Sequence, residues 1–253
     1  MKRFWSGLEG GKKVLIYSPS YKRAGDVKIR EWFKSVILVV HEFEADEYRE
    51  KEGGEILVVP DSLRGNIASV RNFILEEGFR QSDWVVMMDD DNRNLVYFED
   101  GRRHTMNEKQ ALDFMVNGFV MCEEIGFRLW GLNLLDDNKA YREYSPFSMV
   151  SPILGPFSGH IKNPIRYDER LPLKEDYDLA LQHLNEYRGI LRFNKYAYNV
   201  GHIEGSGGVT AYRTKGEEYR QAMVLQGKWG KKIVKYDIER SINPILRVPI
   251  GGI

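Results

Sequence analysis

Short apolar runs alternate with segments of helical periodicity along the first hundred residues of the chain. Each run is only four or five residues long and is rich in β-branched side chains, which is typical of buried strands. Strands that alternate with helices at this spacing predict βαβ units and a mostly parallel sheet. The predicted strands are Val14–Tyr17, Val36–Val40, Ile56–Val59 and Trp84–Met88, and the predicted helices are Val27–Lys34, Glu44–Lys51 and Ile67–Glu77.

The pattern becomes less regular in the second half. Asp100-Gly101 predicts a hairpin turn. The apolar spacing over Asn107–Ile125 predicts a helix that Asn107 caps and Gly126 ends. Further strands are expected at Arg128–Leu134, Met149–Leu154, Phe157–Ile161 and Leu191–Tyr198, with helices from about Pro172 and over Thr214–Gln226.

These patterns together predict an α/β fold. A nucleotide-binding half with a mostly parallel central sheet is expected over about residues 13–100. A mixed half that binds the acceptor, with a C-terminal extension, is expected over about residues 101–253. No repeat or low-complexity tract separates the halves, so we expect a single domain over residues 1–253.

The composition is that of a folded globular protein, because 42% of the 253 residues are hydrophobic and 29% are charged. Basic and acidic residues number 37 each, so the formal net charge is zero and gives no overall attraction to nucleic acid or anionic membranes. The single cysteine, Cys122, excludes an intramolecular disulfide and a multi-cysteine zinc site. No segment has the length of a membrane span. We therefore expect a cytoplasmic protein without membrane attachment.

Three consecutive carboxylates, Asp89, Asp90 and Asp91, follow the apolar run that ends at Met88. Carboxylates at the end of a buried strand repel one another and lose solvation unless a cation is bound. Mg²⁺ and Mn²⁺ prefer oxygen ligands and keep positions open for phosphates. Open α/β sheets bind ligands at this end of their strands. The run therefore predicts a metal-bridged diphosphate site, with a solvated acidic turn as the alternative.

A second acidic pair, Glu175 and Asp176, stands near the start of a predicted helix. The helix macrodipole by itself favours carboxylates at this position, so the pair has a purely structural interpretation. The functional interpretation is that one of the two is a general base that removes a proton from an acceptor hydroxyl.

The order of these motifs resembles the GT-A class of nucleotide-sugar glycosyltransferases over roughly residues 13–210. The resemblance implies a Rossmann-like nucleotide-binding half. Within the class, the amino-acid sequences of several motifs are similar to those of the TET/JBP-associated glycosyltransferases. These enzymes occur in phages and in eukaryotes that modify DNA bases. These motifs are Tyr17-Ser18-Pro19-Ser20-Tyr21-Lys22-Arg23-Ala24-Gly25, Arg71-Asn72 and Glu175-Asp176-Tyr177-Asp178-Leu179, whereas Asp89-Asp90-Asp91 and His202 belong to the resemblance to the class as a whole.

The resemblance implies a set of metal ligands and donor-binding residues. Asp89 and Asp91 match an Asp-x-Asp motif, in which the last carboxylate ligates Mn²⁺ or Mg²⁺ and the first faces the ribose or sugar of the donor. His202 matches a second protein ligand to the metal. Arg71 matches a cation near the donor, and its alternative is a helix-surface arginine. The other residues expected to bind the donor are Ser18, Tyr21, Arg23 and Asp90.

The implied reaction is metal-dependent transfer of a sugar from a nucleotide-diphosphate sugar, with a UDP-sugar as the expected donor. Asp176 is the expected base and Glu175 its alternative, and direct displacement inverts the anomeric centre. The expected acceptor is a hydroxymethylated pyrimidine in DNA, in the host cytoplasm if the chain is phage-encoded. The alternatives are a GT-A enzyme acting on a glycan, protein or small molecule, and a non-catalytic binding protein with a degenerate GT-A fold.

Overall fold

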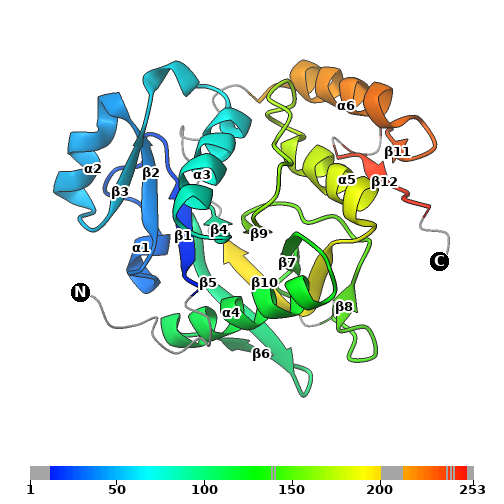
Figure 1. The fold of residues 1–253 in the computed structure, drawn as a ribbon, viewed down its shortest axis with the longest axis horizontal. Helices are drawn as coiled ribbons and strands as arrows, with labels where there is room; N and C mark the ends of the chain where they lie inside the picture. The colour runs from blue at the N-terminus through cyan, green and yellow to red at the C-terminus, as the bar shows by residue number, and fades with distance from the viewer. Residues whose placement is uncertain are drawn as a thin grey trace.

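The computed structural model describes residues 12–137, 139, 141–200, 213–237, 239, 241 and 243–249. The described residues form a ten-stranded sheet with helices packed against it (Figure 1). The first half contains β1 (Val14–Pro19), α1 (Ile29–Trp32), β2 (Ile37–His41), the 3₁₀ turn η1 (Glu42–Glu44), α2 (Ala45–Lys51), β3 (Ile56–Val59), the 3₁₀ turn η2 (Asp61–Leu63), α3 (Ile67–Gln81) and β4 (Trp84–Met88). Its four strands pair in parallel in the order β3-β2-β1-β4.

The second half continues the same sheet with mixed strand directions. Its elements are β5 (Asn92–Glu99), β6 (Arg102–Thr105), α4 (Glu108–Glu124), β7 (Leu129–Asn133), β8 (Phe147–Ser148), β9 (Phe157–Ile161), α5 (Glu175–Tyr187), β10 (Leu191–Val200), α6 (Lys215–Trp229), β11 (Val234–Lys235) and β12 (Ile245–Leu246). Strand β9 runs antiparallel to both β4 and β7, whereas β10 runs parallel to β7 and antiparallel to β5. The predicted α/β fold, with a parallel first half and a mixed second half, is confirmed. None of the described helices is long and apolar enough to cross a membrane.

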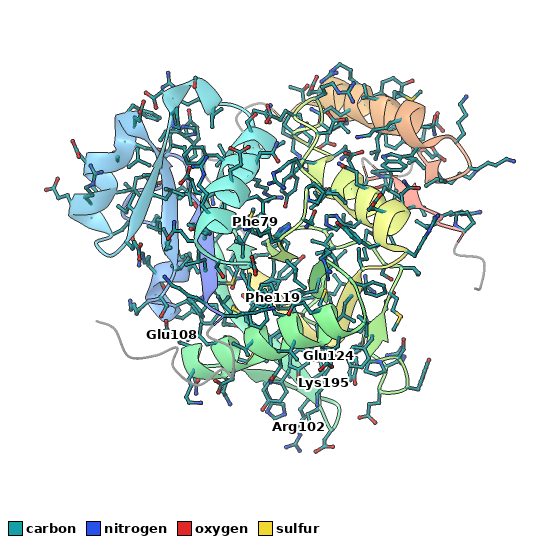
Figure 2. All side chains as sticks on the ribbon, in the orientation of Figure 1. Phe79, Arg102, Glu108, Phe119, Glu124 and Lys195 are labelled. Atoms are coloured by element: carbon teal, nitrogen blue, oxygen red, sulfur yellow. The ribbon has the colours of Figure 1, made fainter. Side chains whose placement is uncertain are left out.

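Side chains of the central strands alternate between the two faces of the sheet and build a core on each. Ile16 of β1 packs on the face covered by α1, α2 and α4, and Tyr17 packs on the face covered by α3 and α5. Strands covered on both faces have apolar side chains at nearly every position. They therefore appear in the sequence as nearly continuous apolar runs. Figure 2 labels Phe79 of α3 and Phe119 of α4, one from each core.

The predicted cap of α4 is confirmed, and α3 has a similar one. The Asn107 side chain accepts the Gln110 N–H at 2.9 Å, and the Gln110 side chain accepts the Asn107 N–H at 3.0 Å. This is a reciprocal capping box. Asn66 caps α3 by accepting the N–H groups of Ala68 and Ser69. Because α3 starts directly after Asn66, its first turn lies at the edge of the cavity described below.

Two sequence predictions of local structure are wrong. The segment Met149–Leu154, predicted as a strand, forms bends and irregular backbone. The Ser148 hydroxyl accepts the Ser151 N–H at 3.0 Å, which turns the chain, and Pro152 has no N–H for a strand ladder. The helix predicted over Val27–Lys34 is reduced to the four residues of α1.

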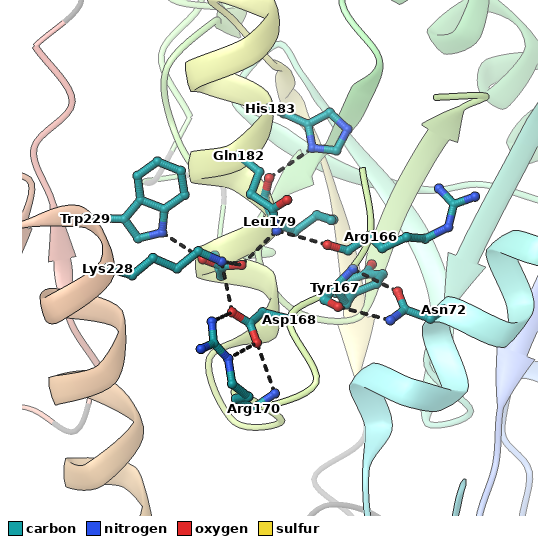
Figure 3. Close-up of polar contacts among 11 residues, drawn as sticks. Asn72, Arg166, Tyr167, Asp168, Arg170, Leu179, Gln182, His183, Lys228 and Trp229 are labelled. Carbon is teal, nitrogen blue, oxygen red and sulfur yellow. Dashed lines mark hydrogen bonds and ion pairs between the residues drawn. The ribbon is translucent and has the colours of Figure 1, made fainter. Parts of the chain in front are cut away.

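The histidine of α5, His183, is buried in the core. Burial lowers the pKa of His183 to about 4. Its Nδ1 lies 2.9 Å from the Leu179 carbonyl oxygen (Figure 3). Because a histidine in an unfolded chain has a pKa near about 6.5, the unfolded state takes up a proton that the folded state does not. The contribution of His183 to the free energy of unfolding therefore falls as the pH drops from about 6.5 towards about 4.

This effect is measurable as a difference between the wild type and His183→Gln. Buried carboxylates with raised pKa values act in the opposite direction in both proteins, so they cancel in the comparison. We expect the stability of the variant relative to the wild type to rise by up to about 1.4 kcal/mol per pH unit as the pH falls below about 6.5. Urea unfolding at several pH values measures this, and a difference that does not change with pH contradicts it.

Candidate active site

A cavity of about 550 Å³ lies at the carboxyl ends of β1, β2 and β4. This volume is in the usual range of ligand-binding sites, and the position is where open α/β sheets bind ligands. Its walls come from the loop after β1, the start of α3, the strand-end aspartates, the start of α5 and the C-terminal extension. The sequence-predicted site residues that line it are Tyr21, Arg23, Arg71, Asp89, Asp90, Asp91, Glu175 and Asp176.

Asp90 holds the loop after β1 in place. Its Oδ2 accepts the Ser20 hydroxyl at 2.5 Å, and its Oδ1 pairs with the Arg23 guanidinium. The Tyr48 hydroxyl lies 2.8 Å from Ser20 Oγ and accepts the Arg23 N–H at 3.0 Å. Burial raises the pKa of Asp90 to about 6, although Arg23 acts to lower it. Both oxygens of Asp90 are thus engaged within the protein, so its contact with the donor stays a prediction.

Tyr21 supplies an aromatic wall to the cavity. Its ring packs edge-on against His41, with centroids 5.6 Å apart, and against Phe43 at 6.0 Å. An aromatic surface beside a polar loop suits a nucleobase. Ser18 is fully buried within β1 and is not among the residues that line the cavity. Its role in donor binding therefore stays a prediction.

The other two aspartates differ in their surroundings. The Asp89 side chain is 39% exposed and pairs with Arg71 Nη2 at 3.3 Å. Asp91 Oδ1 is buried without a hydrogen-bond partner among the described residues. Burial raises the pKa of Asp91 to about 7, and repulsion from Asp89 and Asp90 adds to the rise. A buried carboxylate oxygen without a partner, next to like charges, is an arrangement that a bound cation stabilises.

This donor set fits a divalent cation that also binds phosphates. Among the described residues, no three acidic, histidine or cysteine side chains are grouped so that they hold a metal by themselves. Two carboxylates leave positions for phosphate oxygens, as Mg²⁺ sites commonly do. His202, the third residue that the family resemblance assigns to the metal, lies outside the described residues.

Arg71 links the strand-end aspartates to the start of α5. It is 8% exposed, so the alternative of a helix-surface arginine is wrong. Its Nη2 pairs with Asp89, and its Nη1 pairs with Glu175 Oε1 at 3.0 Å. The guanidinium also lies over the Tyr167 ring, 5.7 Å from its centroid. One buried cation therefore fixes the spacing between the two acidic groups that the sequence identified separately.

The carboxylate pair at the start of α5 faces the same cavity. Asp176 Oδ2 accepts the Gly155 N–H at 3.1 Å, and its Oδ1 accepts the Tyr177 N–H at 2.8 Å. Burial raises the pKa of Asp176 and of Glu175, and the neighbouring charge of Asp176 adds to the rise at Glu175. Glu175 is paired with Arg71, whereas Asp176 is held only by backbone N–H groups. Asp176 is thus the carboxylate of the pair that has no ion pair with another described residue.

Gly155 orients Asp176 from a backbone conformation that favours glycine. Its φ is +76°, and a Cβ at this position would lie 2.6 Å from the Tyr198 hydroxyl oxygen. In Gly155→Ala, the added Cβ therefore requires a shift of either the Tyr198 side chain or the backbone N–H of residue 155, which donates to Asp176. Gly126 has a similar φ of +83°, but a Cβ there has no atom within 4 Å.

We expect both Gly155→Ala and Gly126→Ala to lower stability by about 1–2 kcal/mol, because each forces an L-residue into left-handed backbone. Only Gly155→Ala is expected to reduce turnover further, by about tenfold, because small displacements of a reacting group slow catalysis. Thermal unfolding and initial rates measure the two effects. Equal turnover in the two variants contradicts the positioning role of Gly155.

Sequence reasoning missed several residues of this cavity. Ser20 and Gly155 gain their roles from side chains far away in the sequence, so no local pattern marks them. Arg213 and Asn243 line the cavity from the C-terminal extension. The Arg213 guanidinium is oriented by Glu218, five residues further on, and this spacing is not a recognised helical pair, so no sequence signal marks it.

The parallel first half and the mixed second half of the sheet form the GT-A fold of nucleotide-sugar glycosyltransferases. The structure is similar to that of glucosyl-3-phosphoglycerate synthase from Mycobacterium tuberculosis in complex with phosphoglyceric acid, with a TM-score of 0.53, 10% identity, and coverage of 86% of this chain and 80% of that one. It is also similar to a mycobacterial protein, with a TM-score of 0.52, 9% identity, and coverage of 85% and 74%. At these identities the likeness establishes the fold.

The family is defined by the sequence. A model of the TET-associated glycosyltransferases matches residues 15–208, which is most of the chain. The chain therefore belongs to the TET-associated glycosyltransferase family. A search of curated proteins finds no significant match.

Proposed function

We propose that this protein transfers a sugar from a UDP-sugar to the hydroxyl of a hydroxymethylated pyrimidine in DNA, with inversion at the anomeric carbon. The observation that carries the proposal is the arrangement around Arg71. This buried guanidinium joins Asp89, on the side of the strand-end aspartates, to Glu175, beside Asp176. The residues proposed for the diphosphate site and the proposed proton acceptor thus face one cavity, which is what transfer between two bound substrates requires.

The donor is expected to lie over the carboxyl ends of β1 and β4. Tyr21 would pack against the nucleobase, and Asp89 and Asp91 would hold Mn²⁺ or Mg²⁺, with His202 as the proposed further ligand. The metal, when bound, neutralises negative charge that develops on the departing diphosphate. Asp90 keeps Ser20 and Arg23 in position, so the loop is ordered before the donor arrives.

Asp176 is the proposed general base. Its oxygens are oriented by two backbone N–H groups, and burial raises its pKa, which makes the carboxylate a better proton acceptor. The acceptor hydroxyl oxygen forms a bond to the anomeric carbon while the bond from that carbon to the diphosphate breaks. The hydroxyl proton passes to Asp176, and the nucleoside diphosphate leaves. Attack from the side opposite the leaving group inverts the configuration.

The DNA acceptor is supported by membership in the TET-associated family rather than by the geometry. A base in a duplex has to leave the stack to reach an enclosed site, and the cavity of about 550 Å³ is large enough for an extruded base beside a sugar. The buried free thiol of Cys122 suits a reducing compartment, and we propose the cytoplasm as the location.

The function is tested by measuring UDP release with Mn²⁺ from a panel of UDP-sugars. DNA containing hydroxymethyluracil or hydroxymethylcytosine serves as the acceptor, and DNA of the same sequence without the modification is the control. We expect release to depend on the hydroxymethyl group and the sugar to appear on DNA by mass spectrometry. Release that is stimulated by a glycan, protein or small molecule instead overturns the DNA acceptor, and no turnover together with no Mn²⁺-dependent nucleotide binding favours a non-catalytic binding protein.

A further inference from the structure

The C-terminal extension completes the cavity wall. The family model ends at residue 208, yet Arg213 and Asn243 beyond it line the cavity. In Figure 1, α6 lies beside α5, the helix that begins with Glu175 and Asp176. The extension thus approaches the cavity from the α5 side.

Two buried polar clusters fix α6 to the first turns of α5. At the first, Lys174 pairs with Glu218, and both side chains are at most 2% exposed. At the second, Asp178 accepts Lys228 Nζ at 2.8 Å and Trp229 Nε1 at 2.7 Å (Figure 3). These clusters lie on either side of Glu175 and Asp176 in the sequence. Since a buried charge without its partner is strongly unfavourable, α6 has one well-defined position against the acidic pair.

Arg213 is oriented by the first of these clusters. Its Nε donates to Glu218 Oε1 at 2.6 Å, while the other oxygen of Glu218 pairs with Lys174. This contact occupies the Nε–H of the guanidinium. Within the described part of the chain, Nη1 and Nη2 have no hydrogen-bond or ion-pair partner, and the side chain, which lines the cavity, is 47% exposed. Arg213, Lys174 and Glu218 together carry two positive charges and one negative charge.

A half-exposed guanidinium is suited to binding a phosphate when a buried carboxylate orients it and its other N–H groups are free to donate. The cation that links the strand-end aspartates to α5, Arg71, is already paired with Asp89 and Glu175. Arg213 is bonded instead to Glu218, which pairs with Lys174, the residue directly before Glu175 in the chain.

We propose that Arg213 binds a phosphate of the acceptor strand next to the reacting base, and that Glu218 and Lys174 position it. This inference rests on the proposed function, because it takes the acceptor to be DNA. The chain has no net charge, so contacts of single cations with phosphates, rather than an overall field, have to provide the attraction. The diphosphate of the donor is the other possible source of the phosphate.

Arg213→Ala and Arg213→Lys test the proposal, with Arg220→Ala as the matched control. Arg220 lies in α6, seven residues after Arg213, and pairs with Glu217 at 2.6 Å, but it is not among the residues that line the cavity. The first readout is the affinity for a hydroxymethylated oligonucleotide without donor, at several salt concentrations. We expect Arg213→Ala to weaken it roughly 10- to 100-fold and to reduce the salt slope by about one. Arg213→Lys should keep most of the salt slope, and Arg220→Ala should match the wild type.

The second readout separates the two sources of phosphate. Arg213→Ala should leave the KM for the UDP-sugar within about twofold, because the proposed contact is with the acceptor strand and not with the donor. A raised KM for the donor with unchanged DNA affinity places the phosphate in the donor and overturns the proposal. Equal DNA binding by wild type and Arg213→Ala also overturns it.

The binding measurement needs no turnover, so the failure of this inference is distinguishable from the failure of the proposed function. Loss of DNA affinity in Arg213→Ala supports the phosphate site even if no sugar is transferred. Transfer to DNA that is insensitive to Arg213 supports the function and overturns the site. Thermal unfolding confirms that each variant is folded, and Lys174 still pairs with Glu218 in all of them.

Discussion

Asp176→Asn is expected to lower kcat by about 10²- to 10⁴-fold, which is the usual contribution of a general base. Asparagine keeps one oxygen that can accept the Gly155 N–H and gives up the acceptor of the Tyr177 N–H, while the ability to take a proton is lost. The affinity for the UDP-sugar should change little, because Asp176 is not among the residues proposed to bind the donor. Single-turnover rates and donor binding by calorimetry measure the two quantities.

Glu175→Gln is the control for this prediction. The variant loses the ion pair with Arg71 but leaves that arginine its contact with Asp89. We expect a smaller loss of kcat than in Asp176→Asn, because Glu175 positions Arg71 rather than taking the proton. The opposite order, with full activity in Asp176→Asn and none in Glu175→Gln, identifies Glu175 as the base and contradicts our assignment.

Asp91→Asn is expected to abolish Mn²⁺-dependent binding of UDP and to reduce turnover by about 10²-fold or more, since a bound metal contributes several kcal/mol to the stabilisation of transition-state charge. The same variant should be as stable as the wild type, or more stable, when no metal is present. The reason is that Asp91 Oδ1 has no hydrogen-bond partner among the described residues, and the substitution relieves repulsion from Asp89 and Asp90.

The combination of these effects separates a ligand role from a structural one. A residue that serves the fold loses stability and binding together, whereas a metal ligand loses binding while the metal-free protein gains stability. Thermal unfolding with and without Mn²⁺ and UDP measures both. Asp90→Asn is the matched comparison, because it removes the neighbouring charge but disrupts the contacts with Ser20 and Arg23. A loss of metal-free stability in Asp91→Asn as large as that in Asp90→Asn contradicts the ligand assignment.

The cation that connects the two acidic groups illustrates what sequence reasoning leaves open. In the sequence, Arg71 is one charged residue in a helix with polar and apolar neighbours, so a surface position and a position near the donor are both consistent with the pattern. The structure buries it between Asp89 of the β4 end and Glu175 of α5. The partners lie 18 and 104 residues away, so no local pattern contains them.

The first acidic motif was predictable from its immediate neighbours, because Asp89, Asp90 and Asp91 follow a buried strand directly and repel one another there. Glu175 and Asp176 stand at a helix start, where the macrodipole favours carboxylates, so it was the family resemblance that singled them out. The sequence did not predict how the hydrogen-bond partners differ between the members of each acidic group. Asp90 and Asp91 have the same side chain and adjacent positions, yet one is bonded to Ser20 and Arg23 and the other has an oxygen without a partner.

The sequence by itself determined the parallel first half, the long helices and the positions of the two acidic motifs, because apolar periodicity, caps and clusters of like charge act over a few residues. Only the tertiary structure decided that β9 runs antiparallel between β4 and β7, that Arg71 joins the acidic motifs, and that the segment before α6 places Arg213 at the cavity. These features depend on contacts between residues far apart in the chain. Their energies come from burying specific partners together, which no short stretch of sequence records.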